Sequence, residues 1–307
     1  MIMRYETLKH HAPVFKSVTG LYLVEFDQLI RDITPLWEVA EAQRLYRAGR
    51  QRAPGGGEAP YLDGRDQLLL TIIWLRVYPT HAVLGYLFGV SQPTVSRYLK
   101  RGLRVLEQAG RDTMRLPDPG RKRRRGLPQL LQDMPELTVV VDTFEQRVQR
   151  PQSAAEQNEW YSGKQRTHTI KSQVTVEQQT GRIVHVSASV QGRSSALTLL
   201  RTCGVLEQLP KTVGVLGDTG YQGIAKLHPL GHSPRKRHNG RRVLTEDDRA
   251  YNRAFAQERI VVEMSLNRVR RYQALKQTDR QHRQGHQARV CAVAGLVNRQ
   301  LAYRLAA

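Results

Sequence analysis

The stretch "TVVVDTFEQRVQRP" (residues 138–151) joins a strand-forming run to a carboxylate. Three consecutive valines lead directly into Asp142, and β-branched residues favour strands. Glu145 follows three positions later, and the chain then becomes basic. A strand is a rigid element, so it can hold a carboxylate in one fixed position. The stretch therefore predicts a buried strand whose purpose is to position Asp142.

The charge balance of the whole chain points to a polyanionic partner. Among 307 residues, 48 are Lys or Arg and 27 are Asp or Glu, which gives a formal net charge of +21. Such an excess attracts polyanions, and nucleic acid is the leading candidate. A secreted basic protein or a ribosome-associated protein would show the same balance, so charge alone leaves these alternatives open.

The cysteines and the apolar runs exclude other classes of protein. Cys203 and Cys291 stand far apart without the spacing of a zinc site or a disulfide framework, so we expect free thiols in a reducing compartment. The first fifteen residues lack the apolar core of a secretory signal. The longest mostly apolar run, 68–75, is too short to span a bilayer. We therefore expect a cytosolic protein with no membrane partner.

The first 115 residues have the pattern of an all-α region. Apolar residues recur at helical spacing over 18–49, and the Gly- and Pro-rich segment 51–64 predicts a loop. Three helices are expected next, at about 65–77, at about 80–88, and from Ser91 onward. A short helix, a glycine-containing turn and a polar, basic helix make the layout of a helix-turn-helix, here over about 65–109.

The third of these helices is the expected recognition helix. Val95 and Leu99 would face the core, and the opposite face would carry side chains that reach base edges and phosphates. These are Gln92, Thr94, Ser96, Arg97 and Lys100. An ordinary helical bundle with a solvated face would produce a similar pattern.

A basic linker is expected over 116–136. Five consecutive basic residues at 121–125, Arg123 and Arg124 among them, stand between proline and glycine breakers. Such a segment would follow DNA phosphates. A merely solvated charge run is the alternative interpretation.

From residue 137 the pattern becomes that of an α/β domain. The expected elements are a strand at 137–149, two strands within 167–190 joined by "QQTG", a helix at 194–209, a strand at 212–218, and helices at 245–275 and 287–305. This order matches the start of an RNase H-like fold with a mixed β-sheet. We therefore expect residues 137–307 to form one catalytic domain of that fold.

Three carboxylates occupy positions in this order of elements that suggest a shared site. Asp142 is in the first strand, Asp218 ends the fourth, and Glu263 is on the late helix, and the fold would bring all three to one edge of the sheet. Carboxylate ligands suit Mg²⁺. Two such ions can activate water and stabilise the leaving oxygen of a phosphodiester, with Mn²⁺ as a possible substitute. Singly, each acid also has a structural interpretation, such as an ion pair between Glu263 and Arg259.

Four blocks of the C-terminal half carry a family resemblance. They are "VVVDTFEQRVQRP", "WYSGKQRTHTIKSQVTV", "LGDTGYQG" and "YNRAFAQERIVVEMSLNRVRRYQAL". In this order they resemble the DDE transposases of bacterial insertion sequences, most closely the insertion-sequence-five group with its Harbinger relatives in eukaryotes. The segment "LLLTIIWLRVYPTHAVLGYLFGVSQPTVSRYL" resembles the helix-turn-helix of that group. The resemblance spans about residues 20–300.

The resemblance implies roles for the acids and for two arginines. It assigns Asp142, Asp218 and Glu263 to a metal-binding triad. Arg259 and Arg270 match basic positions of the signature around the glutamate, and at 100° per residue they share a helical face with Glu263. We expect both to take part in catalysis beside the scissile phosphate.

Two parts of the family signature are missing. Ala256 stands where the signature has a tyrosine, and "GRSSA" puts Ser195 and Ala196 where the family often has His-Asp. These differences put the positioning of the substrate in question but leave the triad complete.

The segment "YSGKQRTHTIK" (161–171) is a basic turn that lies by the active site in the resembling family. We expect four of its side chains to hold the scissile strand, although a solvated hairpin would have the same composition. They are Lys164, Arg166, His168 and Lys171. His282 and His286 are four residues apart but lack a third ligand, so we interpret them as solvated.

The leading functional hypothesis is a transposase that binds the terminal inverted repeats of its element through residues 65–109. It would cut there with Mg²⁺-activated water, transfer the freed 3′-hydroxyl to target DNA, and act as a homodimer or larger oligomer. The alternatives are a domesticated or inactive relative that only binds DNA, and a host repair nuclease of the same fold.

Overall fold

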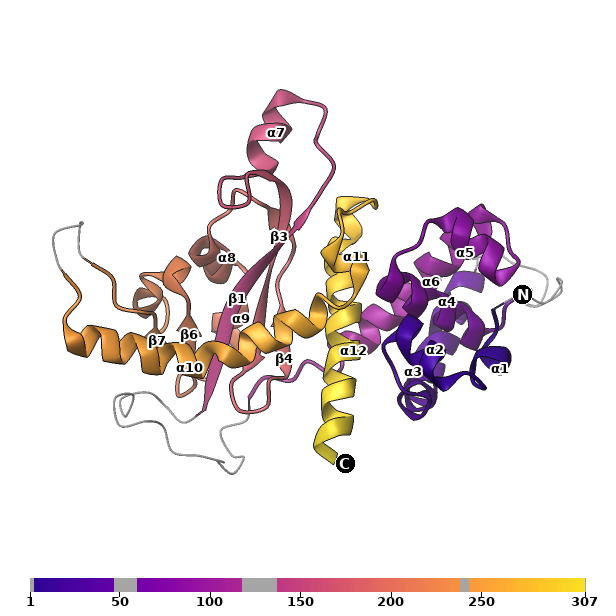
Figure 1. Ribbon diagram of the computed structural model, residues 1–307, viewed down its shortest axis with the longest axis horizontal. Coiled ribbons are helices and arrows are strands. Elements are labelled where there is room, and N and C mark those ends of the chain that lie inside the picture. The colour runs from indigo at the N-terminus through magenta and orange to yellow at the C-terminus, as the bar shows by residue number, and fades with distance from the viewer. Residues whose placement is uncertain (1–2, 47–59, 118–136, 238–242, 307) are drawn as a thin grey trace. The chain divides into compact units, whose positions relative to one another are not determined.

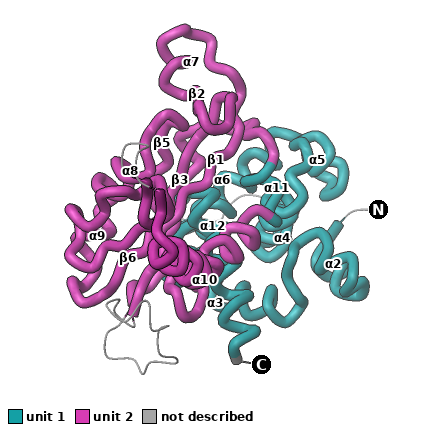
Figure 2. Tube along the Cα trace, turned by 60° about the vertical axis from the view of Figure 1, so that its left-hand side comes forward, with its two compact units in different colours: residues 1–113, 271–276, 288–307 teal, residues 114–270, 277–287 magenta. Residues whose placement is uncertain are grey.

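The structure is a computed structural model that describes residues 3–46, 60–117, 137–237 and 243–306. The chain divides into two compact units (Figure 2). Unit 1 comprises Met1–Thr113, Arg271–Lys276 and Ala288–Ala307, and unit 2 comprises Met114–Arg270 and Gln277–Gln287. The predicted domains followed the order of the chain and gave all of 137–307 to catalysis. By packing, the terminal helix instead belongs with the N-terminal helices.

Unit 1 is all α-helical. Its helices are α1 (Tyr5–Leu8), α2 (Ala12–Thr19), α3 (Leu23–Leu45), α4 (Gly64–Val77), α5 (His81–Phe88), α6 (Gln92–Arg111), α11 (Gln273–Lys276) and nearly all of α12 (His286–Ala306). The single helix expected over 18–49 is interrupted, because Gly20 adopts a left-handed conformation (φ 80°) that ends α2. Left-handed backbone costs glycine little, which makes this residue a natural helix stop.

The helix-turn-helix has the predicted layout. Asp63 caps α4 by accepting the N–H of Asp66 at 2.8 Å. Gly89, with φ 68°, ends α5, and α6 follows two residues later. Val95 and Leu99 are buried as predicted. One local detail differs. Ser91 precedes α6, but its hydroxyl bonds the Thr94 hydroxyl at 3.0 Å and does not cap a backbone N–H.

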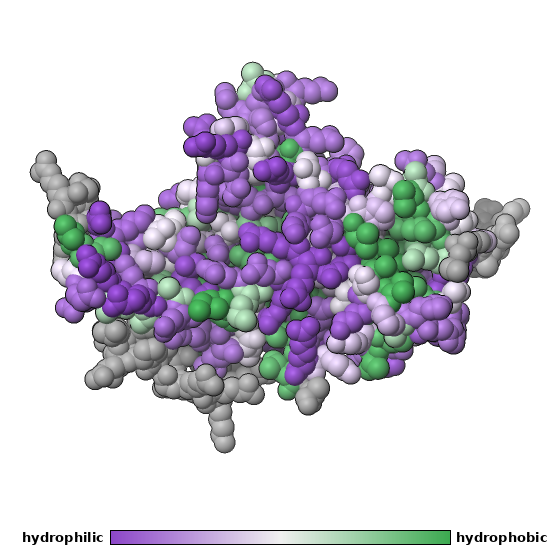
Figure 3. All heavy atoms as spheres, viewed as in Figure 1, coloured by the Kyte–Doolittle hydropathy of each residue, from purple (hydrophilic) through white to green (hydrophobic). Residues whose placement is uncertain are grey.

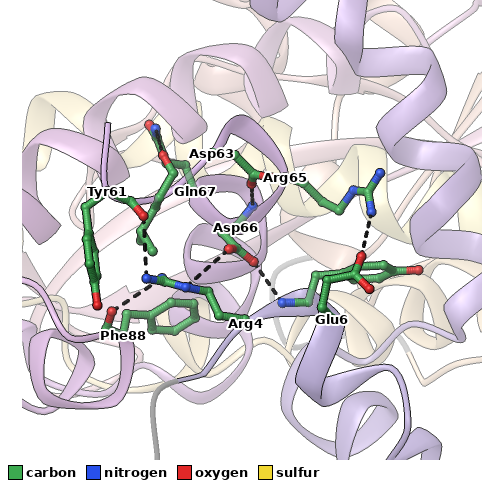
Figure 4. Close-up of polar contacts among 10 residues, drawn as sticks. Arg4, Glu6, Tyr61, Asp63, Arg65, Asp66, Gln67 and Phe88 are labelled. Atoms are coloured by element: carbon green, nitrogen blue, oxygen red, sulfur yellow. Dashed lines mark hydrogen bonds and ion pairs between the residues drawn. The ribbon is translucent and has the colours of Figure 1, made fainter. Parts of the chain in front are cut away.

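A polar network ties the start of the chain to this motif (Figure 4). The backbone N–H of Tyr5 donates to the Asp66 carboxylate at 2.8 Å, and Arg4 Nε lies 3.6 Å from the same carboxylate. Arg4 also donates to the carbonyl of Phe88, the last residue of α5. Burial raises the pKa of Asp66. The N-terminal residues thus fasten α4 to α5 by directed bonds.

Helices α6 and α12 approach each other at a pair of glycines. A Cβ atom on Gly295 would lie 2.3 Å from the Cα of Gly110, far inside contact distance. A Cβ on Gly110 would lie 2.3 Å from the Cys291 carbonyl oxygen. The missing side chains therefore allow the terminal helix to pack directly on the recognition helix.

We predict that Gly295→Ala lowers the free energy of unfolding by about 1–3 kcal/mol, the usual cost of overpacking. Alanine normally favours a helix over glycine, so the sign depends on this contact. Gly163→Ala is the matched control, because nothing lies within 4 Å of its added Cβ. Urea denaturation followed by circular dichroism measures both. Equal midpoints for wild type and Gly295→Ala would contradict the packing.

Unit 2 is built on a mixed β-sheet, as the sequence predicted. Its strands are β1 (Thr138–Arg147), β2 (Tyr161–Ser162), β3 (Thr167–Glu177), β4 (Ile183–Val186), β5 (Val190–Gln191), β6 (Gly214–Gly217) and β7 (Gly231–His232). The order is β2-β3-β1-β6-β7, and β4 and β5 also pair with β3. Strand β1 is antiparallel to β3 and parallel to β6.

Helices and short turns complete unit 2. They are α7 (Ala154–Trp160), α8 (Ala196–Thr202), α9 (Val205–Gln208) and α10 (Glu246–Val269), with short 3₁₀ turns at Thr219–Tyr221, Ile224–Lys226 and Arg283–Gly285. The helix expected at 194–209 is divided into α8 and α9 by Gly204, which has φ 75°. The long helix expected over 245–275 ends at Val269.

The two faces of β1 have different neighbours. Val139 and Val141 join the apolar core that α8 and α9 cover, together with residues such as Leu200 and Val205. Side chains alternate along a strand, so Val140 and Asp142 belong to the opposite face. Figure 1 shows α10 running across the sheet, and α10 contacts both β1 and β3. Asp142 therefore lies on the α10 side.

Candidate active site

The pairing of β1 with β6 places two carboxylates side by side. The last parallel pair is Val141 with Gly217, and β6 ends there. Strand β1 continues to Arg147 along β3. The next residue on each strand is an aspartate, Asp142 and Asp218, and neighbouring strands lie about 4.8 Å apart. Two negative side chains thus meet at the point where the sheet opens.

Local hydrogen bonds hold both aspartates. An Asp142 carboxylate oxygen accepts the N–H of Thr143 at 2.7 Å. An Asp218 oxygen accepts the N–H of Gly220 at 2.8 Å, which starts the 3₁₀ turn that follows β6. Each carboxylate keeps further acceptor capacity, because an ionised carboxylate offers about four lone-pair sites.

Burial and charge oppose each other at Asp142. Its side chain is 18% exposed. Burial raises the pKa of Asp142, and the charge of Asp218 raises it further. The N–H of Thr143 lowers this pKa, as do the charges of Arg259 and Lys164. The pair of aspartates is therefore an environment in which an added cation is favourable.

Helix α10 presents an arginine to this pair. Arg259 Nη2 lies 3.9 Å from an Asp142 carboxylate oxygen, and the Arg259 side chain is 13% exposed. Its Nε is buried without a hydrogen-bond partner among the described residues. The guanidinium thus supplies fixed positive charge and an unused donor beside the two carboxylates.

The third predicted ligand is not part of this cluster. Glu263 lies one helical turn beyond Arg259 and is exposed. The described part of the chain contains no group of three or more His, Cys, Asp or Glu side chains that could hold a metal ion. Asp142 and Asp218 provide the hard oxygen donors that suit a divalent cation. The full triad stays a prediction.

Arg270 also lies outside the cluster. It is exposed and caps the C-terminus of α10, where its backbone N–H donates to the Leu266 carbonyl. Ala256, in the place of the missing tyrosine, is exposed next to the buried Phe255. Ser195 caps α8 by accepting the N–H of Thr198 at 3.0 Å, so this departure from the family pattern has a structural role.

The basic turn that leads into β3 contributes one cation to the site. The positive charge of Lys164 lowers the pKa of Asp142, so Lys164 acts on that carboxylate. Arg166 is exposed and has a positive φ of 51°. The half-buried His168 contacts the ring of Tyr161 edge-on, with centroids 5.7 Å apart.

Lys171 requires a correction. It is buried and lies 3.3 Å from a carboxylate oxygen of Glu145, its direct partner across β1 and β3. Its ammonium also donates to the Ser194 carbonyl, and Thr169 donates to Glu145 at 2.6 Å. The sequence predicted a DNA contact, but this ammonium is engaged inside the domain. Glu145, the acid that follows Asp142 in the stretch 138–151, is therefore the counter-charge of Lys171.

We predict that Lys171→Ala lowers the free energy of unfolding by about 3–5 kcal/mol, because it leaves the carboxylate of Glu145 buried and unpaired. Lys164→Ala, an exposed lysine on the same hairpin, should leave stability within about 0.5 kcal/mol of wild type. Urea denaturation compares the two variants. A Lys171→Ala protein with wild-type stability and weakened DNA binding would instead indicate that Lys171 contacts DNA, as the sequence predicted.

The histidine pair also differs from the sequence interpretation. His282 is exposed, but His286 is fully buried. Its Nδ1 is 2.8 Å from Ser189 Oγ and its Nε2 is 2.9 Å from Gln146 Oε1. His286 therefore joins the sheet to the start of α12 as a structural side chain.

Tyr221 is a residue of the site that sequence reasoning did not single out. It is fully buried, and its hydroxyl donates to Gln173 Oε1 at 3.1 Å. Burial raises its pKa well above the ordinary value, and the charges of Asp142 and Asp218 add to this. A Cβ on Gly217 would lie 2.5 Å from Tyr221 Cβ. The "GDTGY" sequence was the available signal, since the glycine before Asp218 makes room for this ring.

The predicted DNA-contacting residues of unit 1 lie on one exposed part of α6. Gln92, Ser96, Arg97 and Lys100 are exposed, and Thr94 is partly buried. Arg123 and Arg124 lie outside the described residues. The face drawn in Figure 3 is largely hydrophilic over α7, whereas apolar side chains interrupt the hydrophilic ones over α10.

Comparison with protein families gives two matches that together span both units. Residues 141–298 match the model of the DDE superfamily endonuclease. The chain belongs to this family. Residues 61–112 match the helix-turn-helix of the DDE superfamily endonuclease, the segment that contains α4, α5 and α6. The match over 141–298 begins one residue before Asp142, so the side-by-side aspartates lie within it.

A curated relative supports the same identification. The chain is 30% identical over 260 residues to a probable transposase for insertion sequence element IS702 from Microchaete diplosiphon. The alignment covers 85% of this chain and 89% of the relative. This DDE family member is thus a transposase with an endonuclease domain and a helix-turn-helix that binds DNA. Enzymes of the family use divalent metal ions. Across the described ranges, every helix is too short or too polar to traverse a bilayer.

Proposed function

We propose that this transposase binds the terminal inverted repeats of an insertion sequence through α4, α5 and α6, and there cuts DNA and transfers the freed strand with Mg²⁺. The observation that carries the proposal is the pair Asp142 and Asp218 at the opening between β1 and β6, with Arg259 beside it. Adjacent carboxylates with a fixed cation suit phosphoryl transfer, in which metal ions and phosphate share one site.

The chemistry of the donors supports a hard divalent cation. Asp142 and Asp218 would hold it, with Glu263 from α10 as the third carboxylate, and two ions would be bound when DNA is present. If these carboxylates hold Mg²⁺, or Mn²⁺ in its place, the site would gain activation of the attacking oxygen and stabilisation of the leaving one. Strands β1 and β6 fix the directions of both aspartates, so little reorganisation is needed on binding.

The cations of the site act on the phosphate. Arg259 and Lys164 would stabilise the negative charge that spreads over the non-bridging oxygens in the transition state. Arg270, further along α10, would hold the DNA near the scissile bond. In the first step a P–O bond to water forms and the bond to the 3′-oxygen breaks. In the second step that 3′-hydroxyl would attack a phosphate of target DNA, forming a new P–O bond while the bond from that phosphorus to the target strand's own 3′-oxygen breaks, and no covalent protein intermediate is required.

A homodimer or larger oligomer would carry out the reaction in the bacterial cytosol, because two element ends must be processed together. A second candidate, an inactive relative that only binds DNA, gains support from three features. Glu263 stands apart from the aspartates, and Ser195 and Ala256 replace family residues. Cleavage distinguishes the two candidates.

We predict that Asp142→Asn, Asp218→Asn and Glu263→Gln each abolish Mg²⁺-dependent cleavage of DNA that carries the element ends. Each change removes a ligand charge with almost no change in shape, so end binding should persist. Single-turnover cleavage and gel-shift assays measure the two properties on the same duplex. A variant that cleaves at a rate near wild type would remove its residue from the triad.

Asp247→Asn is the matched control, because Asp247 is an exposed carboxylate in the first turn of α10, on the same helix as Glu263. It should cleave at the wild-type rate. If the wild-type chain itself binds ends but never cleaves them with Mg²⁺ or Mn²⁺, the inactive-relative candidate holds.

We predict that Gln92→Ala and Ser96→Ala reduce the preference for end sequence over scrambled duplex. These side chains are exposed at the start of α6 and can reach base edges, where a good contact contributes about 1–3 kcal/mol of discrimination. Binding of the scrambled duplex should hardly change. Competition binding at fixed salt measures both. A footprint on the ends that survives deletion of residues 1–125 would contradict this use of the helix-turn-helix.

A further inference from the structure

A groove between α3 and α6 in unit 1 is lined by several cationic side chains that are not among the predicted base-reading residues. It is a cavity of about 340 Å³. From α3 it is lined by Trp37, Ala40, Glu41 and Arg44, and from α6 by Arg97, Lys100, Arg101, Arg104 and Val105. We call it the α3–α6 groove.

The groove is strongly cationic. Five of its lining side chains are Arg or Lys, against a single carboxylate, Glu41, among the lining residues. On α6 the cations follow steps of three and four residues, which place them in one row along the helix. So many like charges in one groove repel each other and cost stability unless a polyanion is bound.

The guanidinium groups are held in place but are not all neutralised. Arg44 forms a close ion pair with Glu41 (2.7 Å), and Arg101 lies 3.9 Å from the same carboxylate. Arg104 donates to the neutral Gln43 side chain at 2.9 Å. One carboxylate therefore serves two arginines. Preorganised arginines suit phosphate, which they can bind through two parallel hydrogen bonds.

The groove continues along α6 in both directions. Toward the start of the helix, a neighbouring pocket shares Arg44, Arg97 and Arg101 and reaches Ser91. Toward its end, another shares Arg104 and Val105 and reaches Arg111. The groove and its neighbouring pockets thus accompany the helix for most of its length, which is about 30 Å for 20 residues, and the surface is less basic at the far end, where Arg111 pairs with Glu107.

We propose that the α3–α6 groove binds the sugar-phosphate backbone of duplex DNA, beside the face of α6 that reads the bases. The inference rests on the proposed binding of DNA by this helix. A helix inserted in the major groove, which is about 12 Å wide, has a phosphate backbone along each side. Arg97 and Lys100 belong both to the base-reading face and to the groove, so the two surfaces are continuous.

The floor of the groove favours a duplex backbone over an unstacked base. The Trp37 ring packs against the start of α4, where a Cβ on Gly64 would lie 3.2 Å from Trp37 Nε1. One edge of the ring is therefore packed against α4, and Trp37 is the one aromatic side chain among the described residues that line the groove. Single-strand binding sites stack successive bases on several aromatic side chains, which this groove does not offer. Helix α3 becomes a second wall for the DNA, a role that the sequence pattern did not indicate.

The test compares Arg44→Gln on α3 and Arg104→Gln on α6 in the full-length protein. Three probes of equal length are used: a duplex with an element end, a scrambled duplex and a single strand. Each variant should lose one phosphate contact, so the salt dependence of duplex binding should fall by about 0.9 in slope. At 0.1 M salt, both duplexes should therefore bind roughly eightfold more weakly.

Arg31→Gln is the matched control. Arg31 is an exposed arginine of the same helix α3, bonded to Gln28, and it does not line the groove. It should leave the slope unchanged. Thermal midpoints should agree among all variants, because the ion pair of Arg44 is exposed and weak.

The outcomes separate this inference from the proposed function. Groove variants that bind both duplexes with wild-type affinity and slope would overturn the inference. Groove variants that weaken only the binding of the single strand would overturn the inference as well. If the wild-type protein binds the element end and the scrambled duplex equally well, only the proposed end recognition is overturned. The effect of the groove variants can still be measured on the scrambled duplex.

Discussion

The catalytic unit depends on where one ladder of hydrogen bonds stops. Strand β6 pairs with β1 up to Val141 and Gly217 and then ends, whereas β1 continues along β3. Parallel pairing keeps residues level, so the next residue on each strand is placed beside the other. If β6 were longer, its backbone would continue in the sheet and Asp218 would not form the turn that follows. If it shifted by one residue, Asp218 would move to the other face. The side-by-side placement of the two carboxylates is therefore a consequence of register.

The polar residues around this point divide into structural and chemical groups. Glu145 and Lys171 neutralise each other within the domain, and His286 bonds Gln146 and Ser189. These contacts stabilise β1 and β3 on the C-terminal side of Asp142 along β1. Arg259 and Lys164, in contrast, act on the Asp142 carboxylate by charge. Metal-dependent phosphoryl transfer needs both groups, since a site of like charges is stable only on a rigid frame.

In the helical unit, helix α6 is likewise held in place by very close contacts with its neighbours. Gly102 lies against Thr71 of α4, and Gly110 lies against α12, so α6 is enclosed on its inner side by close backbone contacts. Its outer side carries two sets of polar side chains. The exposed start of the helix offers short polar side chains, and the α3–α6 groove offers arginines. Short polar groups distinguish bases, whereas arginines bind any backbone, so one helix can supply both specificity and affinity.

The sequence by itself determined the helix-turn-helix, the mixed sheet and the aspartates. These follow from local patterns: Gly89 stops α5, the valines before Asp142 form β1, and "GDTG" follows a short strand. Only the tertiary structure decided which partners each side chain meets. Lys171 turned out to pair with Glu145 because their strands are in register, and His286 is buried because α12 begins against the sheet. The terminal helix packs with the N-terminal helices through Gly110 and Gly295, two residues far apart in the chain. A sequence records each residue's own preferences, whereas burial and pairing depend on distant residues that only folding brings together.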